Sequence, residues 1–283
     1  MSSHEKHPSN LNRARRHFLG LAAATGAKIA GLGVIASSIL PSSKANAWGR
    51  NWGRNWGGTG GGTGGGKDSQ GACFLAGTSI LTSKGEVPIE DIRVGDLVRT
   101  VHGGTRPVRW VGRRAYTRTG PTWHPNIAPI RVARHSVDGQ TPHRDLYISG
   151  GHALYLDGAL IEARYLVNDR SIAPTAPDAD TVEYFNILLD THDVIFAEGL
   201  PVETFRMVNG NHELFSNFAE LEQLMPSASR VAMASFAPRL NCYGGRDHLK
   251  ALLDIAAHPF KSPRDPIADA RERLAARALE ASR

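Results

Sequence analysis

The feature that most restricts the fold of this 283-residue chain is an abrupt change of composition at Cys73. Residues 57–66, shortly before it, contain only glycine and threonine. After Cys73, short apolar and β-branched runs alternate with turn residues such as Gly77, Gly85 and Gly95. Short strands separated by frequent turns favour an all-β body built largely of antiparallel pairs.

The strand-like runs and the helical patterns occupy different parts of the chain. The expected strands lie at residues 108–111, 127–132, 146–149, 159–163 and 184–189. After residue 205, apolar residues at helical spacing predict helices at residues 218–225, 248–257 and 266–283. The last of these is amphipathic and mostly solvent-facing, and we expect it to pack on the β body or on a partner rather than on a membrane.

Composition excludes some classes of function. The chain is 41% hydrophobic and 21% charged, as in globular proteins, and its net charge of +6 is scattered rather than gathered in a block. We therefore expect no nucleic-acid partner. The two cysteines, Cys73 and Cys242, leave a disulfide open but form no CxxC pair, and His124, His135 and His143 are interpreted as loop residues. No metal or cofactor is expected.

The N-terminus has the layout of an export signal. A basic head with Arg15 and Arg16 precedes an apolar run of small residues, and Ala45 and Ala47 form an A-x-A cleavage site. The paired arginines followed by Phe18-Leu19 resemble a twin-arginine signal, which implies the twin-arginine export machinery as a partner and a periplasmic or extracellular location. A plain secretory signal is the alternative. The run carries glycines and Lys28, so no stable membrane anchor is expected.

Two WGRN repeats and the glycine–threonine repeats follow the signal. Such a composition cannot bury enough apolar surface to offset backbone entropy. We predict a signal peptide over residues 1–47 and a flexible Trp/Gly-rich linker over residues 48–72.

From Cys73 onward, several blocks resemble one known module. They are CFLAGT (73–78), IEDI (89–92), VGDLV (94–98), SGGH (149–152), YFNILL (184–189) and GLPVETF (199–205). Their order resembles the Hint domain, shared by inteins and the processing domain of hedgehog proteins, and is most similar to the bacterial intein-like subgroup. The resemblance implies an antiparallel Hint fold over residues 73–206, followed by a mostly helical C-terminal extension over residues 207–283.

The resemblance also implies a chemistry. Cys73 would attack the carbonyl of the Ala72–Cys73 peptide bond in an N–S acyl shift, with His152 as proton donor to the departing nitrogen. Ser149 would hydrogen-bond the junction or hold the imidazole in place. His192 either assists the reaction or satisfies a buried strand.

Splicing to completion is not expected. Where inteins end in His-Asn followed by a nucleophile, this chain has Glu203-Thr204. The sequence therefore predicts single-turnover N-terminal cleavage through a thioester, with water or an unidentified nucleophile as acyl acceptor. The alternative is a catalytically inert Hint-like scaffold that serves as an extracytoplasmic binding module.

Overall fold

The computed structural model describes residues 71–208, 210–226, 232–240 and 265–280. Several predictions fall outside these residues: the signal peptide with Arg15, Arg16, Ala45 and Ala47, the linker up to residue 70, the helix at 248–257, and Cys242. None of the helices in the described ranges has the length and apolar character needed to cross a membrane.

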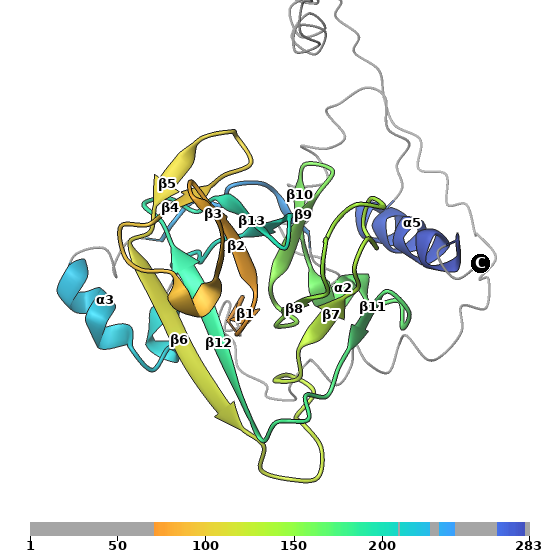
Figure 1. Cartoon of the computed structure of the whole chain (residues 1–283), viewed down its shortest axis with the longest axis horizontal. Coiled ribbons are helices and arrows are strands. Elements are labelled where there is room, and N and C mark those ends of the chain that lie inside the picture. Colours follow the sequence, from red (N-terminus) through yellow and green to blue (C-terminus); the bar gives the residue numbers. More distant parts are fainter. Residues whose placement is uncertain (1–70, 209, 227–231, 241–264, 281–283) are drawn as a thin grey trace, which may run out of the picture. The chain divides into compact units, whose positions relative to one another are not determined.

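The described strands form two sheets (Figure 1). The six-stranded sheet has the order β11 (Ile172–Pro174), β7 (Ile130–Val132), β8 (Leu146–Ile148), β1 (Phe74–Leu75), β12 (Thr181–Leu188) and β6 (Trp110–Thr117). The nine-stranded sheet has the order β15 (Arg239–Leu240), β10 (Ala159–Glu162), β9 (Ala153–Leu156), β14 (Leu200–Glu203), β13 (Val194–Ala197), β2 (Ser79–Thr82), β4 (Leu97–Arg99) and β5 (Thr105–Pro107), with β3 (Gly85–Pro88) paired to β2. Among the described pairs, only β10 with β15 is parallel. The predicted all-β, largely antiparallel fold is confirmed.

Helices are few and short within the β body. The described helices are η2 (Ile89–Asp91) and η3 (Asn211–Leu214), both 3₁₀, and the α-helices α2 (Ala163–Leu166), α3 (Phe218–Leu224) and α5 (Pro266–Glu280). Helices α3 and α5 confirm two of the helices expected after residue 205. Helix α2 differs from the prediction, because Ala163 begins a helical turn instead of ending a strand.

The position of β1 fixes the start of the folded body. This two-residue strand lies between β8 and β12, where Phe74 is opposite both Ile148 and Phe185. Phe74 is fully buried in the main hydrophobic cluster. The residue before it, Cys73, is thereby held at the beginning of a central strand rather than on a free loop.

The C-terminal extension is joined to the body at both sheet edges. Beyond β6, Ser216 donates its backbone N–H to the Arg113 carbonyl at 2.8 Å, and the Asn217 side chain bonds the backbone of Val111 and Arg113. At the edge of the second sheet, β15 pairs with β10. Unpaired edge groups are costly when buried and invite aggregation when exposed, so these contacts stabilise the body. The sequence analysis does not predict β15.

Helix α5 buries one face. Ile267, Ala270 and Leu274 recur at helical spacing and join the same hydrophobic cluster as Phe74. Leu279, near the end of the same helix, is 49% exposed. The expectation that this helix packs on the β body is confirmed.

Gly112 lies where no side chain fits, and we expect Gly112→Ala to destabilise the fold by about 1–3 kcal/mol. A Cβ there would be 2.6 Å from Cη2 of Trp110 and 2.7 Å from Cδ1 of Phe215. Both rings are buried and pack edge to face at 5.2 Å, so neither can withdraw freely. Denaturant unfolding measures the loss. In the control Gly104→Ala the new Cβ meets nothing within 4 Å; an equal loss in both variants would contradict the steric explanation.

Candidate active site

The thiol of Cys73 is buried beside the first residues that the structure describes. Its side chain is 4% exposed, and it is a free cysteine. Burial raises the pKa of the Cys73 thiol to about 12, and the positive charge of Arg114 offsets only part of that effect. At neutral pH the sulfur is therefore protonated, and a base must remove its proton before it can act as a nucleophile.

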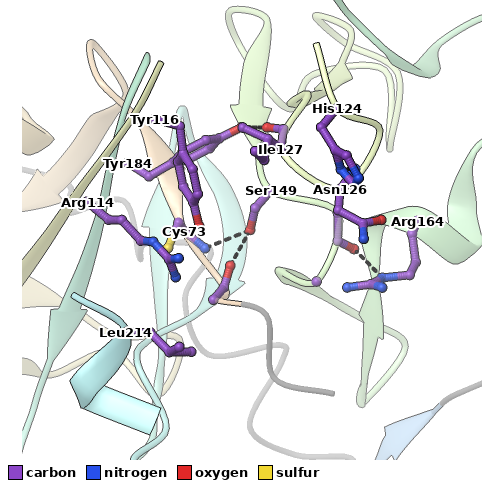
Figure 2. Close-up of a pocket in the computed structure, with 13 residues that line it drawn as sticks. Cys73, Arg114, Tyr116, His124, Asn126, Ile127, Ser149, Arg164, Tyr184 and Leu214 are labelled. Atoms are coloured by element: carbon purple, nitrogen blue, oxygen red, sulfur yellow. Dashed lines mark hydrogen bonds between the residues drawn. The ribbon is translucent and has the colours of Figure 1, made fainter. Parts of the chain in front are cut away.

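Ser149 contacts the junction at three points, and contact with the junction is one of the two roles that the resemblance implies for it. It follows β8, so its backbone N–H continues the ladder and donates to the Cys73 carbonyl at 2.9 Å. Its Oγ accepts the Cys73 N–H at 2.9 Å and donates to the Gly71 carbonyl at 2.6 Å. These hydrogen bonds, drawn in part in Figure 2, fix the backbone on both sides of the Ala72–Cys73 bond.

Asn186 holds the other polar group of the same peptide bond. It is fully buried in the middle of β12, and its Nδ2 donates to the Ala72 carbonyl oxygen. Its Oδ1 accepts the Ile187 N–H at 2.8 Å, which orients the amide so that its NH₂ group faces that carbonyl. The Ala72 oxygen is the atom on which negative charge would develop during attack by a thiolate, so Asn186 occupies the position of an oxyanion donor.

His152 is fully buried beside Phe74, the residue that follows Cys73. Its ring centroid lies 4.3 Å from that of Phe74, and its Nε2 is 3.0 Å from the Glu203 carbonyl oxygen. A carbonyl only accepts, so Nε2 carries the hydrogen and Nδ1 is the bare nitrogen, which has no hydrogen-bond partner among the described residues. Burial lowers the pKa of His152, and the Glu203 carboxylate and the Cys73 backbone oppose this only in part. The imidazole is therefore neutral at neutral pH, with one nitrogen free to accept a proton.

A cavity of about 350 Å³ adjoins Cys73 and Ser149. Besides these two residues its wall includes Arg114, Tyr116 and Tyr184 (Figure 2). Arg114 lies over the Tyr116 ring at 4.6 Å, an attractive cation–π geometry. The cavity offers space for a small nucleophile next to the thiol. His124, interpreted from sequence as a loop residue, also lines it.

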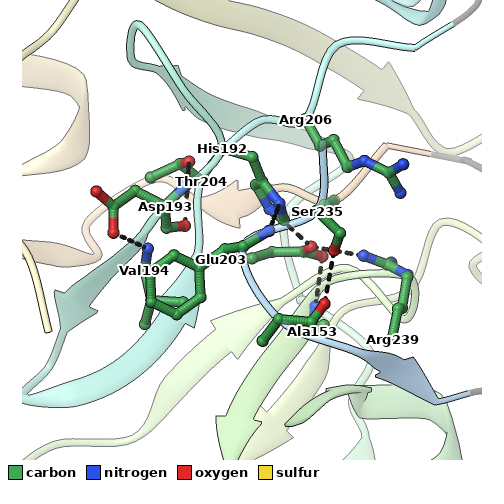
Figure 3. A network of polar contacts seen from close by, with 12 residues as sticks. Ala153, His192, Asp193, Val194, Glu203, Thr204, Arg206, Ser235 and Arg239 are labelled. Atoms are coloured by element: carbon green, nitrogen blue, oxygen red, sulfur yellow. Dashed lines mark hydrogen bonds and ion pairs between the residues drawn. The ribbon is translucent and has the colours of Figure 1, made fainter. Parts of the chain in front are cut away.

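His192 lies in a second polar network, shown in Figure 3. Its Nδ1 accepts the Phe236 N–H at 3.0 Å, and its Nε2 is 3.4 Å from Oε2 of Glu203. Glu203 also accepts the Ala153 N–H at 2.8 Å and pairs with Arg239 at 2.5 Å. Of the two roles left open for His192, this placement favours the structural one, because the described partners of its two ring nitrogens belong to this network and not to the Cys73 junction.

Glu203 and Thr204, which the resemblance sets against the terminal His-Asn of inteins, are both buried, and both side chains make polar contacts. Thr204 Oγ1 accepts the Asp193 N–H at 3.0 Å and donates to the Asp193 carbonyl at 3.2 Å. Burial alone would raise the pKa of Glu203, but the positive charge of Arg239 and the nearby His192 ring bring it down to about 2. Glu203 is therefore a carboxylate at neutral pH, stabilised by its partners.

We expect the free energy of unfolding to decrease in two stages as the pH falls from neutrality. The folded pKa of His152 is lowered, so the unfolded state binds the proton first and stability is lost below the ordinary value of 6.5. The contribution of Glu203 is present above its ordinary value of 4.5 and is lost as the pH falls toward 2. Each group gives a slope of up to about 1.4 kcal/mol per pH unit.

Urea unfolding at a series of pH values measures both stages. Glu203→Gln should flatten the lower stage while leaving the upper one in place. A free energy of unfolding that stays constant as the pH falls from neutrality to well below 6.5 would contradict the assignment of a neutral buried imidazole.

Comparison with known proteins defines the class of this fold. Residues 72–209 match the family model described as Hint domain. Together with the two antiparallel sheets and the thiol at the start of a central strand, this match shows that this part of the chain has a Hint fold. Arg239 and α5 lie outside the matched residues.

Several solved structures are similar to the chain. A bacterial intein-like domain from Clostridium thermocellum is 21% identical, with 48% of this chain and 99% of that one covered and a TM-score of 0.36. The gp41-1 intein is 16% identical, covers 47% and 98%, and has a TM-score of 0.34. A DnaB intein from Synechocystis sp. PCC 6803 is 9% identical, covers 48% and 99%, and has a TM-score of 0.34. No curated protein matches the chain.

The sequence analysis assigned no role to Asn186, Arg114 or Arg239. The sequence does contain a pattern that could have pointed to Asn186. It is the one polar residue in the apolar run at 184–189, and a polar group buried there needs a hydrogen-bond partner. Arg114 and Arg239 carry no comparable local signal. Among the described residues, no group of three or more His, Cys, Asp or Glu side chains could hold a metal ion.

Proposed function

We propose that the protein is an exported, self-processing Hint domain that cleaves its own Ala72–Cys73 bond by an N–S acyl shift. One observation carries the proposal. Both polar groups of that peptide bond are held by side chains from distant strands, the N–H by Ser149 and the carbonyl by Asn186. A bond fixed in this way, beside a thiol in the adjacent residue, is positioned for intramolecular attack.

The residues divide the reaction between them. The bare Nδ1 of His152 accepts the thiol proton, and the Cys73 sulfur bonds to the Ala72 carbonyl carbon. The carbonyl electron pair moves to the oxygen, where Asn186 donates a hydrogen bond. The carbon–nitrogen bond then breaks, and the proton passes from His152 to the Cys73 nitrogen, leaving a thioester and a free amine.

Water or another nucleophile resolves the thioester. Its oxygen or sulfur adds to the Ala72 carbon, the carbon–sulfur bond breaks, and the Cys73 thiol is regenerated as a fragment ending at Ala72 is released. The cavity beside Cys73 provides room for this acceptor. Each molecule reacts once, so the process is autoproteolysis and not multiple-turnover catalysis.

The proposal includes cleavage without splicing. Glu203 and Thr204 replace the terminal His-Asn of inteins, and their side chains are committed to the buried contacts with Arg239 and Asp193. Neither residue supplies the amide chemistry that would break a second bond.

Export by a twin-arginine signal over residues 1–47 and a linker over residues 48–72 are also part of the proposal. A folded domain that cleaved at once would detach its own signal. The high pKa of the Cys73 thiol, about 12, favours slow cleavage, which would leave time for export.

The same burial favours the second candidate, an inert scaffold that acts as a binding module. A thiol that is 4% exposed and protonated at neutral pH is a weak nucleophile unless His152 activates it. The two functions differ in one measurable quantity, the mass of the purified chain.

Intact-mass spectrometry of the full chain, incubated with and without added thiol or hydroxylamine, tests the proposal. Self-processing predicts a fragment that begins at Cys73, formed faster with the added nucleophile because it intercepts the thioester. Full-length chain alone under all of these conditions would leave the inert scaffold as the function.

A further inference from the structure

A segment of the C-terminal extension, residues 232–240, runs across the second sheet and over the Glu203 network. Its backbone is tied down at several points: Met233 N–H donates to the Met207 carbonyl at 2.8 Å, and the Pro238 carbonyl accepts the Leu160 N–H at 2.8 Å. Strand β15 then pairs with β10 in parallel. The segment is therefore part of the folded body, and it brings Arg239 to the site.

The guanidinium of Arg239 has three partners. Nη1 pairs with Oε2 of Glu203 at 2.5 Å, and Nη2 donates to the Gly151 carbonyl at 2.9 Å. Nη2 also lies 3.2 Å from Oε1 of Glu162. The planar fork of an arginine suits such a set of fixed acceptors, which one lysine ammonium could not match in geometry.

These contacts enclose His152 on both sides along the chain. Arg239 binds the carbonyl of the preceding residue, Gly151, while the Glu203 carboxylate binds the N–H of the following residue, Ala153, at 2.8 Å. The Glu203 backbone carbonyl accepts the hydrogen of His152 Nε2 at 3.0 Å. Arg239 and Glu203 thus hold the backbone on both sides of His152, and the Glu203 backbone carbonyl sets the tautomer of the ring.

Four charged or acidic side chains surround His152. Glu203 on β14 and Glu162 on β10 are the acidic ones, burial raises the pKa of Glu162, and Arg239 on β15 and Arg164 on α2 are the basic ones. The other titratable neighbours are the protonated Cys73 thiol before β1 and His192, which contacts Glu203. Without Arg239, the Glu203 carboxylate would be left buried and poorly compensated beside the imidazole.

We propose that Arg239, which lies beyond the residues matched by the family model, is a positioning residue for self-processing. By holding Glu203 and Gly151 it keeps His152 in the orientation and tautomer that leave Nδ1 free to accept the thiol proton. This inference rests on the proposed function, in which His152 is the base. Its direct consequence is that the C-terminal extension is required for a competent site at the N-terminal end of the domain.

The test compares four variants of the full chain with the wild type. They are Arg239→Gln, Arg239→Lys, the double variant Glu203→Gln/Arg239→Gln, and Arg273→Gln as the control. Arg273 also joins the extension to the body through an ion pair, with Asp157, but it is exposed and distant in sequence from every residue of the site. The readouts are the rate of formation of the fragment beginning at Cys73 and the NMR titration and tautomer of His152.

We expect Arg239→Gln to slow cleavage by up to about 100-fold, as displaced catalytic groups do, and to raise the titration midpoint of His152. Arg239→Lys should restore the His152 titration midpoint but only part of the cleavage rate. A lysine keeps the positive charge but lacks the planar, forked donor geometry of the guanidinium. The double variant removes the uncompensated carboxylate, so it should fold even if Arg239→Gln does not. Its His152 titration midpoint should lie near that of the wild type, and its cleavage should be slow. Arg273→Gln should match the wild type in both readouts.

An unchanged cleavage rate, His152 midpoint and tautomer in the folded Arg239 variants would overturn the inference while leaving the proposed function standing. If the wild type shows no cleavage, the proposed function fails instead. The NMR titration then tests by itself whether Arg239 positions His152. A His152 midpoint and tautomer that are unchanged in the Arg239 variants would overturn the inference.

Discussion

Cys73→Ala should abolish the fragment that begins at residue 73, with or without added thiol and at every pH at which the domain is folded. The sulfur supplies the new bond to the Ala72 carbon, and no other described nucleophile is adjacent to that carbon along the chain. The structure predicts little accompanying loss of stability, because alanine fills most of the volume of a buried thiol that makes no hydrogen bond in the described structure. Intact-mass spectrometry measures the effect.

Cys242→Ala is the matched control for this variant. It removes the other cysteine of the chain, and Cys73 is a free cysteine, so cleavage should continue. A fragment beginning at residue 73 in the Cys73→Ala protein would show that water or a contaminating protease breaks the bond, and the acyl shift would be excluded.

Asn186→Ala should slow cleavage by about 10²–10³-fold, which corresponds to about 2.7–4 kcal/mol in the barrier. Asn186 is the described side-chain donor to the Ala72 carbonyl oxygen, and the site is buried, where a hydrogen bond to a developing negative charge is worth most. Single-turnover rates measured by mass spectrometry give the ratio directly.

Asn168→Ala controls for the loss of a structural asparagine. Asn168 Oδ1 accepts backbone N–H groups from residues 170, 171 and 172, in a loop whose contacts do not include the junction. This variant should be less stable than the wild type yet cleave at the same rate while folded. If Asn186→Ala cleaves as fast as Asn168→Ala, the amide has no part in stabilising the oxyanion.

The elements of the fold could be predicted where they depend on local pattern. The continuous apolar run at residues 184–189 predicts part of β12, and the helical spacing after Pro266 predicts α5, because a run of buried residues and a helical period both appear in neighbouring positions of the sequence. The four-residue helix α2 was not predicted, since one helical turn leaves no periodicity to detect.

The site could be predicted only in part, and the division has a physical reason. Cys73, Ser149 and His152 fall within blocks that resemble the Hint domain; the structure places Ser149 against the Cys73 junction and the His152 ring beside Phe74, the next residue. Asn186 meets Ala72 only through the pairing of β1 with β12, a long-range register that no local spacing encodes. The position of Arg239 depends on the parallel pairing of β10 with β15, a strand that comes still later in the chain.

The central place of β1 in its sheet has a consequence for the time at which the proposed reaction can start. The ribosome delivers Cys73 early, but Ser149, Asn186 and Arg239 leave the exit tunnel in turn afterwards, and β1 has no neighbours until β8 and β12 have been synthesised. The order of synthesis therefore sets the time at which the site can assemble. Under the proposed mechanism, a nascent chain stalled before residue 239 would lose its leading segment much more slowly than a chain that includes this residue.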